Sequence, residues 1–126
     1  MDLPTQAHLK TLRDLLRYRL GELRADVHAA EMARQHAGDD AAGVDVADRK
    51  DEAARDQLTA LGGREEERDR EEMRQVEAAL HRLDTGVYGD CADCGEPIPL
   101  QRLLVQPTAV RCAGCQARVE AAAPGR

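Results

Sequence analysis

The chain has 126 residues, of which 33% are charged, and it contains two tyrosines but neither tryptophan nor phenylalanine. Aromatic side chains supply much of the area that a globular core buries, so this composition argues against a large core and favours long exposed helices. The formal net charge is −6 with the histidines neutral. An acidic chain gains no free energy by releasing counterions from a phosphate backbone, so we expect no direct DNA binding. An acidic surface is better suited to a basic groove on another protein.

Residues 3–37 are predicted to form the first helix. They contain one internal glycine, Gly21, and no proline after Pro4, which lies at the start of the range. Their apolar residues recur at spacings of three or four, the pattern of a helix that packs along one side. Gly38 is the expected end of this helix. The apolar positions are Leu9, Leu12, Leu16, Leu20, Leu23, Val27 and Ala30.

A second helix is predicted from about residue 46 to residue 84, after a short acidic, glycine-containing tip. Gly62 and Gly63 allow a local bend, and the polar run 64–72 reads as a solvated face with spaced pairs such as Glu66–Arg70. Two long helices joined by a short loop indicate an antiparallel hairpin. The apolar positions of the second helix are Ala54, Leu58, Leu61, Met73, Val76, Leu80 and Leu83.

The last third of the chain is rich in glycine, proline and cysteine and is expected to form a small separate module with a short final helix over 116–122. The predicted fold is therefore mainly α: a long antiparallel two-helix coiled-coil hairpin over 1–85, with its tip at about 38–48, and a small four-cysteine module over 86–126. The N-terminus lacks the basic and apolar regions of a signal peptide, and no apolar run approaches the ~18 residues of a membrane span. We expect a cytoplasmic protein without membrane contact.

Two Cys-x-x-Cys pairs form the strongest motif in the chain. Cys91 and Cys94 make the first pair, and Cys112 and Cys115 the second. This spacing is typical of a tetrahedral structural Zn²⁺ site, and four protein ligands leave no open position for catalysis. A pair of disulfides or four free thiols is the alternative, which a reducing compartment disfavours. We therefore expect one structural zinc ion, which makes residues 86–126 a zinc-finger module, and no enzymatic activity.

Other side chains of the module have both a functional and a plain structural interpretation. Arg102, Arg111 and Arg118 either offset the negative charge of a four-thiolate zinc site or are simply solvated. Tyr88 is expected to pack against the zinc module. The chain contains no serine, which excludes Ser-His-Asp chemistry.

The cysteine region resembles the zinc finger of the DksA/TraR family in four segments: 86–98 (GVYGDCADCGEPI), 102–103 (RL), 107–109 (PTA) and 112–116 (CAGCQ). The preceding hairpin is similar to those of the family in layout. The resemblance implies a regulator that inserts its hairpin into the secondary channel of RNA polymerase. It also implies that acidic residues at the tip alter initiation near the active site, in many members jointly with guanosine tetraphosphate.

The family's tip motif, Asp-x-x-Asp-x-Ala, fits this chain in two registers. Asp45 and Asp48 supply both acids but place Lys50 where alanine is expected. Asp48, Asp51 and Ala53 satisfy the whole pattern and fit the family's arm length better, with Asp45 as an accessory. The same acids also suit a helix N-terminus as caps and through the helix dipole, and the two interpretations can hold together.

The nucleotide site that the resemblance implies is incomplete in this sequence. Matched by distance from the cysteines, Arg68 keeps a basic residue and is the candidate nucleotide contact. Gln75 and Gln116 stand where lysines are expected, and a neutral amide cannot supply the charge that a pyrophosphate needs. The sequence therefore predicts weak or absent dependence on guanosine tetraphosphate.

Three hypotheses follow for the function. The leading one is a monomeric bacterial transcription regulator that binds the secondary channel of RNA polymerase. The alternative is a zinc-stapled coiled-coil adaptor that binds another protein along the hairpin. The third, a zinc ribbon that binds nucleic acid, is disfavoured by the net negative charge.

Overall fold

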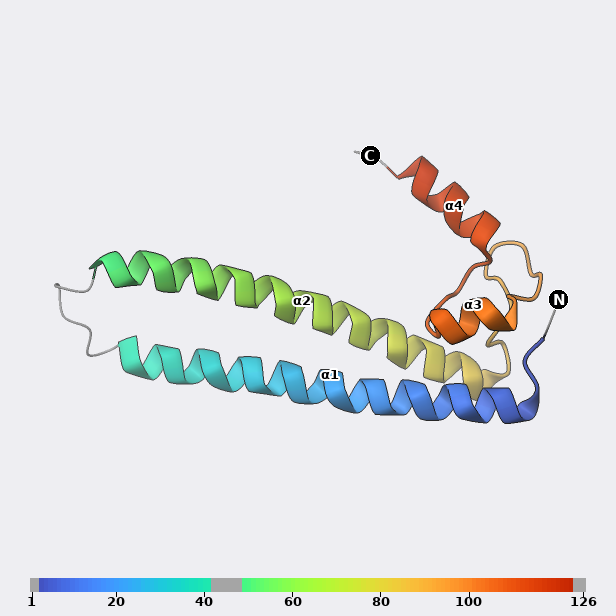
Figure 1. Cartoon of the computed structure of the whole chain (residues 1–126), viewed down its shortest axis with the longest axis horizontal. Helices are drawn as coiled ribbons and strands as arrows, with labels where there is room; N and C mark the ends of the chain where they lie inside the picture. The colour runs from blue at the N-terminus through green and yellow to red at the C-terminus, as the bar shows by residue number, and fades with distance from the viewer. Residues whose placement is uncertain (1–2, 42–48, 124–126) are drawn as a thin grey trace. The chain divides into compact units, whose positions relative to one another are not determined.

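The computed structural model describes the backbone of residues 3–41 and 49–123, and the side chains of residues 3–36 and 62–123. Within these ranges the chain is mainly helical, and an isolated bridge between Asp90 and Pro97 is the only pairing of extended backbone. The predicted mainly α fold is confirmed. The helices are α1 (Gln6–Ala41), α2 (Arg49–Thr85), α3 (Leu100–Val105) and α4 (Ala113–Ala122), as Figure 1 shows.

The chain gathers into two compact units. Unit 1 comprises Met1–Arg19 and Gln75–Arg126, and unit 2 comprises Leu20–Arg74. Unit 1 therefore contains one end of each long helix together with α3 and α4, and unit 2 contains the remainder of α1 and α2. The division into a hairpin over 1–85 and a zinc module over 86–126 stays a prediction.

In unit 1, the start of α1 and the end of α2 lie side by side and form part of the core. Leu12 of α1 is fully buried, as is Ala79 of α2. An ion pair of 2.6 Å joins Arg13 Nη1 to Asp84 Oδ1 at the edge of this contact. Leucines and alanines favour helix, and their placement at spacings of three or four is what allows one face of each helix to be buried.

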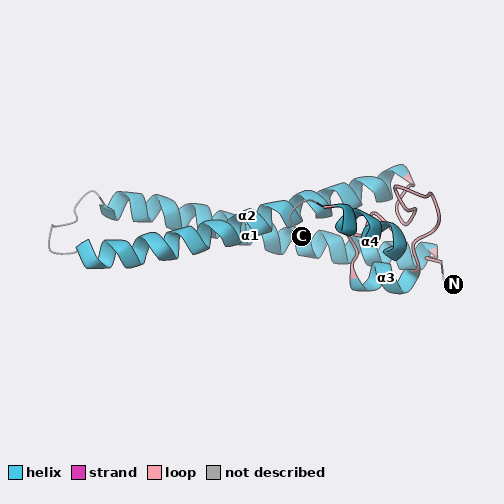
Figure 2. Cartoon of the chain, turned by 90° about the horizontal axis from the view of Figure 1, so that it is seen from above, coloured by secondary structure: helices cyan, strands magenta, loops and turns pink. Residues whose placement is uncertain are grey.

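In unit 2, α1 and α2 also lie side by side and run in opposite directions (Figures 1 and 2). Leu20, Leu23 and Val27 continue the buried stripe of α1, with 7%, 0% and 6% of their surfaces exposed. Cross-helix ion pairs between residues 31–34 and 66–70 confirm the antiparallel pairing. The predicted two-helix coiled-coil hairpin is thus present.

The predicted helix ends need correction. α1 continues through Gly38 to Ala41, so the expected stop at Gly38 was wrong. A glycine inside a helix costs only about 1 kcal/mol, which the continuing backbone hydrogen bonds can outweigh. For the same reason α2 runs unbroken through Gly62 and Gly63. None of the helices in the described ranges is both long and apolar enough to cross a membrane.

Candidate metal centre

The first cysteine pair lies on a tight turn of unit 1. The bridge between Asp90 and Pro97 brings the two sides of the turn together, and the Cys91 amide donates to the Glu96 carbonyl at 2.9 Å. The Gly95 amide donates back to the Cys91 carbonyl at 3.0 Å. Gly95 has φ +75°, a left-handed conformation that glycine adopts without a steric penalty. The turn therefore presents both thiols of the pair on the same side.

The second cysteine pair lies at the start of α4. Cys112 is the residue that precedes the helix, its carbonyl accepts a 2.9 Å hydrogen bond from the Gln116 amide, and Cys115 lies in the first turn. The short final helix is confirmed, but it begins at Ala113 rather than at residue 116. A 2.8 Å hydrogen bond from the Ala92 amide to the Val110 carbonyl joins the backbones that carry the two pairs.

These two turns place four sulfur atoms together. The Sγ atoms of Cys91, Cys94, Cys112 and Cys115 all lie within 4.8 Å of one another, and those of Cys94 and Cys112 are 3.9 Å apart. Four sulfurs at about 2.3 Å from a tetrahedral Zn²⁺ would be separated by about 3.8 Å, whereas a disulfide needs about 2.05 Å. No disulfide joins any of these four cysteines, and their sulfur spacing is that of ligands around one ion. The four cysteines form a site for one structural zinc ion.

Backbone amides prepare two of the cysteines to bind as thiolates. The Cys94 amide, with that of Cys112 second, lowers the pKa of the Cys91 thiol to about 6. The Cys115 amide similarly lowers the pKa of the Cys112 thiol. Hydrogen bonding to the Cys112 thiol raises the pKa of Cys115 to about 12, because neighbouring sulfurs cannot all be negative without a cation between them. A divalent ion is the species that allows all four to ionise together.

The thiols are backed by a small apolar core within unit 1. Ile98 and Leu103 are fully buried, and Tyr88 is 8% exposed. The Tyr88 hydroxyl donates to the Pro107 carbonyl at 2.8 Å, and burial raises the pKa of Tyr88 to about 12. The prediction that Tyr88 packs against the zinc module is confirmed. Gly89 has φ +90°, and a Cβ added at this residue would lie 3.7 Å from Cδ1 of Leu103.

Two of the three arginines connect the halves of the site. Arg111 Nε donates to Asp93 Oδ2 at 2.8 Å, which links the residue before Cys112 to the first pair. Arg102 Nε donates to the Arg111 carbonyl at 3.0 Å. Arg118 is exposed on α4. The first two arginines therefore fix the turns that carry the cysteines.

The predicted tip residues lie at the edge of the description or beyond it. Asp45 and Asp48 fall outside the described residues. Asp51 and Ala53 belong to the backbone of α2, but their side chains are not among those described. The tip motif and its register therefore stay predictions.

The residues of the predicted nucleotide contact are described. Arg68 is exposed on α2, and so is Gln75. Gln116 is partly exposed, and its amide donates to Glu120 Oε1 at 3.1 Å. Gln116 is thus hydrogen-bonded along its own helix. The candidate contact at Arg68 stays a prediction.

Glu66 is the residue whose position the sequence analysis missed. Instead of lying on a solvated face, it is 7% exposed and lies between α1 and α2 of unit 2. The sequence did contain a signal of this burial. Position 66 belongs to a heptad repeat with spacings of three and four, and residues of such a repeat face the partner helix. The positions of this repeat are 66, 69, 73, 76, 80 and 83. The expected Glu66–Arg70 pair does form, at 3.3 Å.

The cysteine region matches a known family of zinc fingers. Residues 86–121 match the model of the prokaryotic dksA/traR C4-type zinc finger. The RNA polymerase-binding transcription factor DksA of Haemophilus influenzae is 38% identical over 73 residues, which are 58% of this chain and 50% of that protein. The match thus spans about half the length of that relative.

Two longer similarities include the hairpin. DksA of Escherichia coli is 30% identical over 115 residues, 91% of this chain and 73% of that protein. The structure of transcription factor DksA2 from Pseudomonas aeruginosa has a TM-score of 0.76 and 34% identity, and the match covers 91% of this chain and 84% of that one. The names of these relatives describe transcription factors rather than enzymes. On both the zinc site and the helices that precede it, this chain belongs to the DksA family of C4-type zinc-finger proteins.

Proposed function

We propose that this protein is a bacterial transcription regulator that binds RNA polymerase and acts from its secondary channel. The observation that supports it most is the similarity to DksA of E. coli, a protein named for binding RNA polymerase, over 91% of this chain. A match confined to the zinc finger would support only a shared metal site. This one includes the antiparallel helices as well.

The proposed action takes place at the hairpin tip. Asp48 and Asp51, with Ala53 completing the motif and Asp45 as an accessory, act close to the polymerase active site and alter initiation. A carboxylate at the tip can interact there with a cation through charge-assisted hydrogen bonds or with a metal ion. The zinc site keeps the module folded and takes no part in this chemistry.

The proposed regulator works as a cytoplasmic monomer and depends little on guanosine tetraphosphate. Arg68 alone retains a positive charge among the three positions expected to contact the nucleotide, while Gln75 and Gln116 are neutral. Comparable inhibition of transcription with and without the nucleotide is the expected result. Strong synergy between nucleotide and protein would contradict it. The protein is not expected to bind DNA, given its net charge of −6.

The first experiment asks whether the chain binds polymerase and where. Tagged protein should retain purified RNA polymerase in a pull-down, and a transcript-cleavage factor that occupies the secondary channel should displace it. Retention without displacement would place the binding site elsewhere. No retention would favour the alternative of a coiled-coil adaptor for a different protein.

The second experiment separates binding from action. The double variant Asp48→Asn with Asp51→Asn removes both charges at nearly constant size, so it should still bind polymerase but lose the effect on transcription. Asp26→Asn is the matched control, because Asp26 is an exposed acid on α1 of unit 2. An unchanged effect in the double variant would refute the assignment of the tip acids.

A further inference from the structure

The contact between α1 and α2, called the seam below, changes from apolar to charged residues along unit 2. Leu20, Leu23 and Val27 bury the α1 side of the seam, but the residues that continue the stripe are Ala30 and Arg34. On α2, the described residues from 62 to 72 include no large apolar side chain. In this stretch, apolar burial can contribute little to holding the two helices together.

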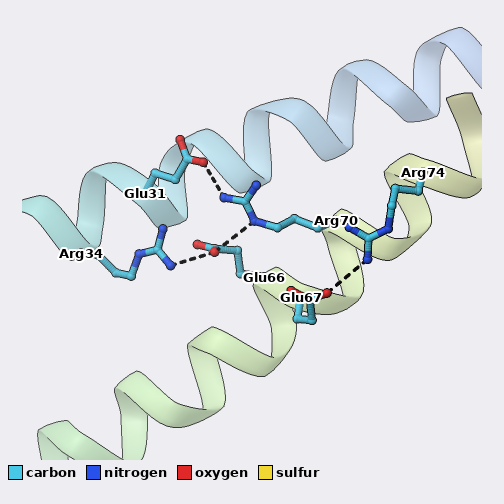
Figure 3. Close-up of polar contacts among 6 residues, drawn as sticks. All are labelled: Glu31, Arg34, Glu66, Glu67, Arg70 and Arg74. Carbon is cyan, nitrogen blue, oxygen red and sulfur yellow. Dashed lines mark hydrogen bonds and ion pairs between the residues drawn. The ribbon is translucent and has the colours of Figure 1, made fainter.

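A cluster of four charged residues occupies the stretch instead (Figure 3). Arg34 of α1 donates to Glu66 Oε2 at 2.8 Å, and Arg70 donates to the same oxygen at 3.3 Å. Arg70 also reaches back to α1, where its Nη2 donates to Glu31 Oε1 at 2.5 Å. Glu31, Arg34, Glu66 and Arg70 are called the clasp below. Its two carboxylates and two guanidiniums cancel in charge.

The members of the clasp are not equally exposed. The Glu66 side chain is 8% exposed, whereas those of Arg34, Arg70 and Glu31 are 52%, 37% and 41% exposed. The other Glu66 oxygen, Oε1, is buried and meets no donor among the described residues. A buried carboxylate needs its cationic partners because it cannot be hydrated in place. Separating the helices would therefore deprive the buried Glu66 of its bond from Arg34 and leave it only the i,i+4 bond from Arg70 within α2.

A polar seam contact also selects one arrangement of the helices. Leucine and valine pack acceptably in several rotations and registers, whereas a buried polar residue is satisfied only where its partner stands opposite. Arg34 meets Glu66 across the seam, and Arg70 meets Glu31 one turn further along. Both contacts need the same rotation of α1 against α2.

We propose that Glu66 is a positioning residue, which through the clasp holds α1 against α2 in unit 2 and thereby sets the placement of the acidic tip residues. This inference rests on the proposed function for its consequence in transcription. Its structural half, that the clasp closes this part of the hairpin, stands independently and can be tested on the isolated protein.

The structural test is amide hydrogen exchange of the full zinc-bound chain. In Glu66→Gln, which keeps the size of the side chain but removes its charge, peptides covering 20–36 and 62–74 should exchange at least about tenfold faster. Peptides of unit 1 should be unchanged. Glu65→Gln is the matched control, because Glu65 is the adjacent residue of α2 and is exposed. Equal exchange in the two variants would overturn the inference.

If Glu66→Gln does not fold, Arg34→Gln takes its place, since it removes the same cross-helix bond from a half-exposed side chain. Faster exchange of the same peptides supports the clasp, and wild-type exchange refutes it.

The functional test asks whether Glu66 acts through the tip. Glu66→Gln should be retained by RNA polymerase within about twofold of wild type and yet show a weaker effect on transcription. Introduced into the Asp48→Asn, Asp51→Asn background, it should add nothing. A further loss in that background would refute a positioning role. If no variant binds polymerase, the proposed function fails, while the exchange experiment still decides whether the clasp exists.

Discussion

Removal of the metal should unfold the zinc module while leaving most of the paired helices intact. Structural zinc contributes about 10–16 kcal/mol in small modules, comparable to or larger than the 5–15 kcal/mol that stabilises a whole domain. The buried side chains of α3 are Leu100 and Leu103, and α4 buries only its zinc ligand Cys115. Without the ion, nothing else described in α4 fixes its ten residues, and so short a helix is marginal in water.

The expected loss of helix can be worked from the element lengths. α3 and α4 contain 6 and 10 residues, whereas α1 and α2 contain 36 and 37. If the module unfolds and the long helices persist, circular dichroism at 222 nm should lose about a fifth of its helical signal. The assay is titration of the reduced protein with a chelator, with one equivalent of released zinc measured in parallel and recovery of the signal on adding zinc back.

Two results would refute this reasoning. An unchanged spectrum after complete release of the metal would mean that the ion does not hold the module. A loss of more than half of the helical signal would mean that α1 and α2 depend on the ion, despite the buried stripe that they share. The variant Cys94→Ser should have the same circular dichroism spectrum as the zinc-free wild-type protein, because serine offers no thiolate.

Three further outcomes follow from burial, backbone conformation and ionisation. Leu23→Ala should lower the free energy of unfolding by about 2–5 kcal/mol in a denaturant titration, because Leu23 is fully buried. Gly62→Ala should raise the melting temperature, because alanine is more stable than glycine in a helix by about 1 kcal/mol and a Cβ at this position would contact no other atom. Gly89→Ala should instead lower the free energy of unfolding by about 1–3 kcal/mol, because Gly89 has φ +90°. In a Tyr18→Phe variant, in which Tyr88 is the remaining tyrosine, the absorbance titration should have its midpoint near pH 12. The free energy of unfolding should fall as the pH rises from 10 to 12, because in this range the Tyr88 hydroxyl keeps its proton in the folded state and loses it in the unfolded state.

Each of these outcomes has its own control and contradiction. Leu15→Ala should cost little because Leu15 is 48% exposed, and a cost equal to that of Leu23 would contradict the buried stripe. Equal effects of alanine at the two glycines would contradict the difference in backbone conformation. A Tyr88 midpoint near pH 10 would show that the hydroxyl is in contact with water in the folded protein.

The sequence was most informative where a single local pattern determines the outcome. The spacings of three or four between Leu9 and Val27 predict the packed face of α1 because that periodicity is a property of the helix itself. The two Cys-x-x-Cys pairs predict the zinc ligands because a gap of two residues suits two thiolates on one ion. Neither inference needs knowledge of the rest of the fold.

The sequence was least informative where a distant partner decides. α3, over Leu100–Val105, was not predicted, because six apolar and polar residues are too few to show a helical period and its burial depends on the rest of unit 1. Glu66 was assigned to a solvated face because its neighbours are charged, but its burial depends on Arg34, 32 residues earlier. The stop expected at Gly38 failed because glycine weakens a helix without ending it.

The attachment of α4 directly to Cys112 affects which ions can enter the four-cysteine site. The first amides of α4 carry partial positive charge, and the amide of Cys115 donates to the Cys112 sulfur, so the helix helps to neutralise the surplus negative charge that four thiolates leave around a divalent ion. This stabilisation acts on the thiolate sulfurs and does not depend on which divalent metal they bind. Cobalt(II) should therefore be able to replace the colourless native ion. The visible absorption of tetrahedral cobalt thiolates would then report loading and release in the unmodified chain.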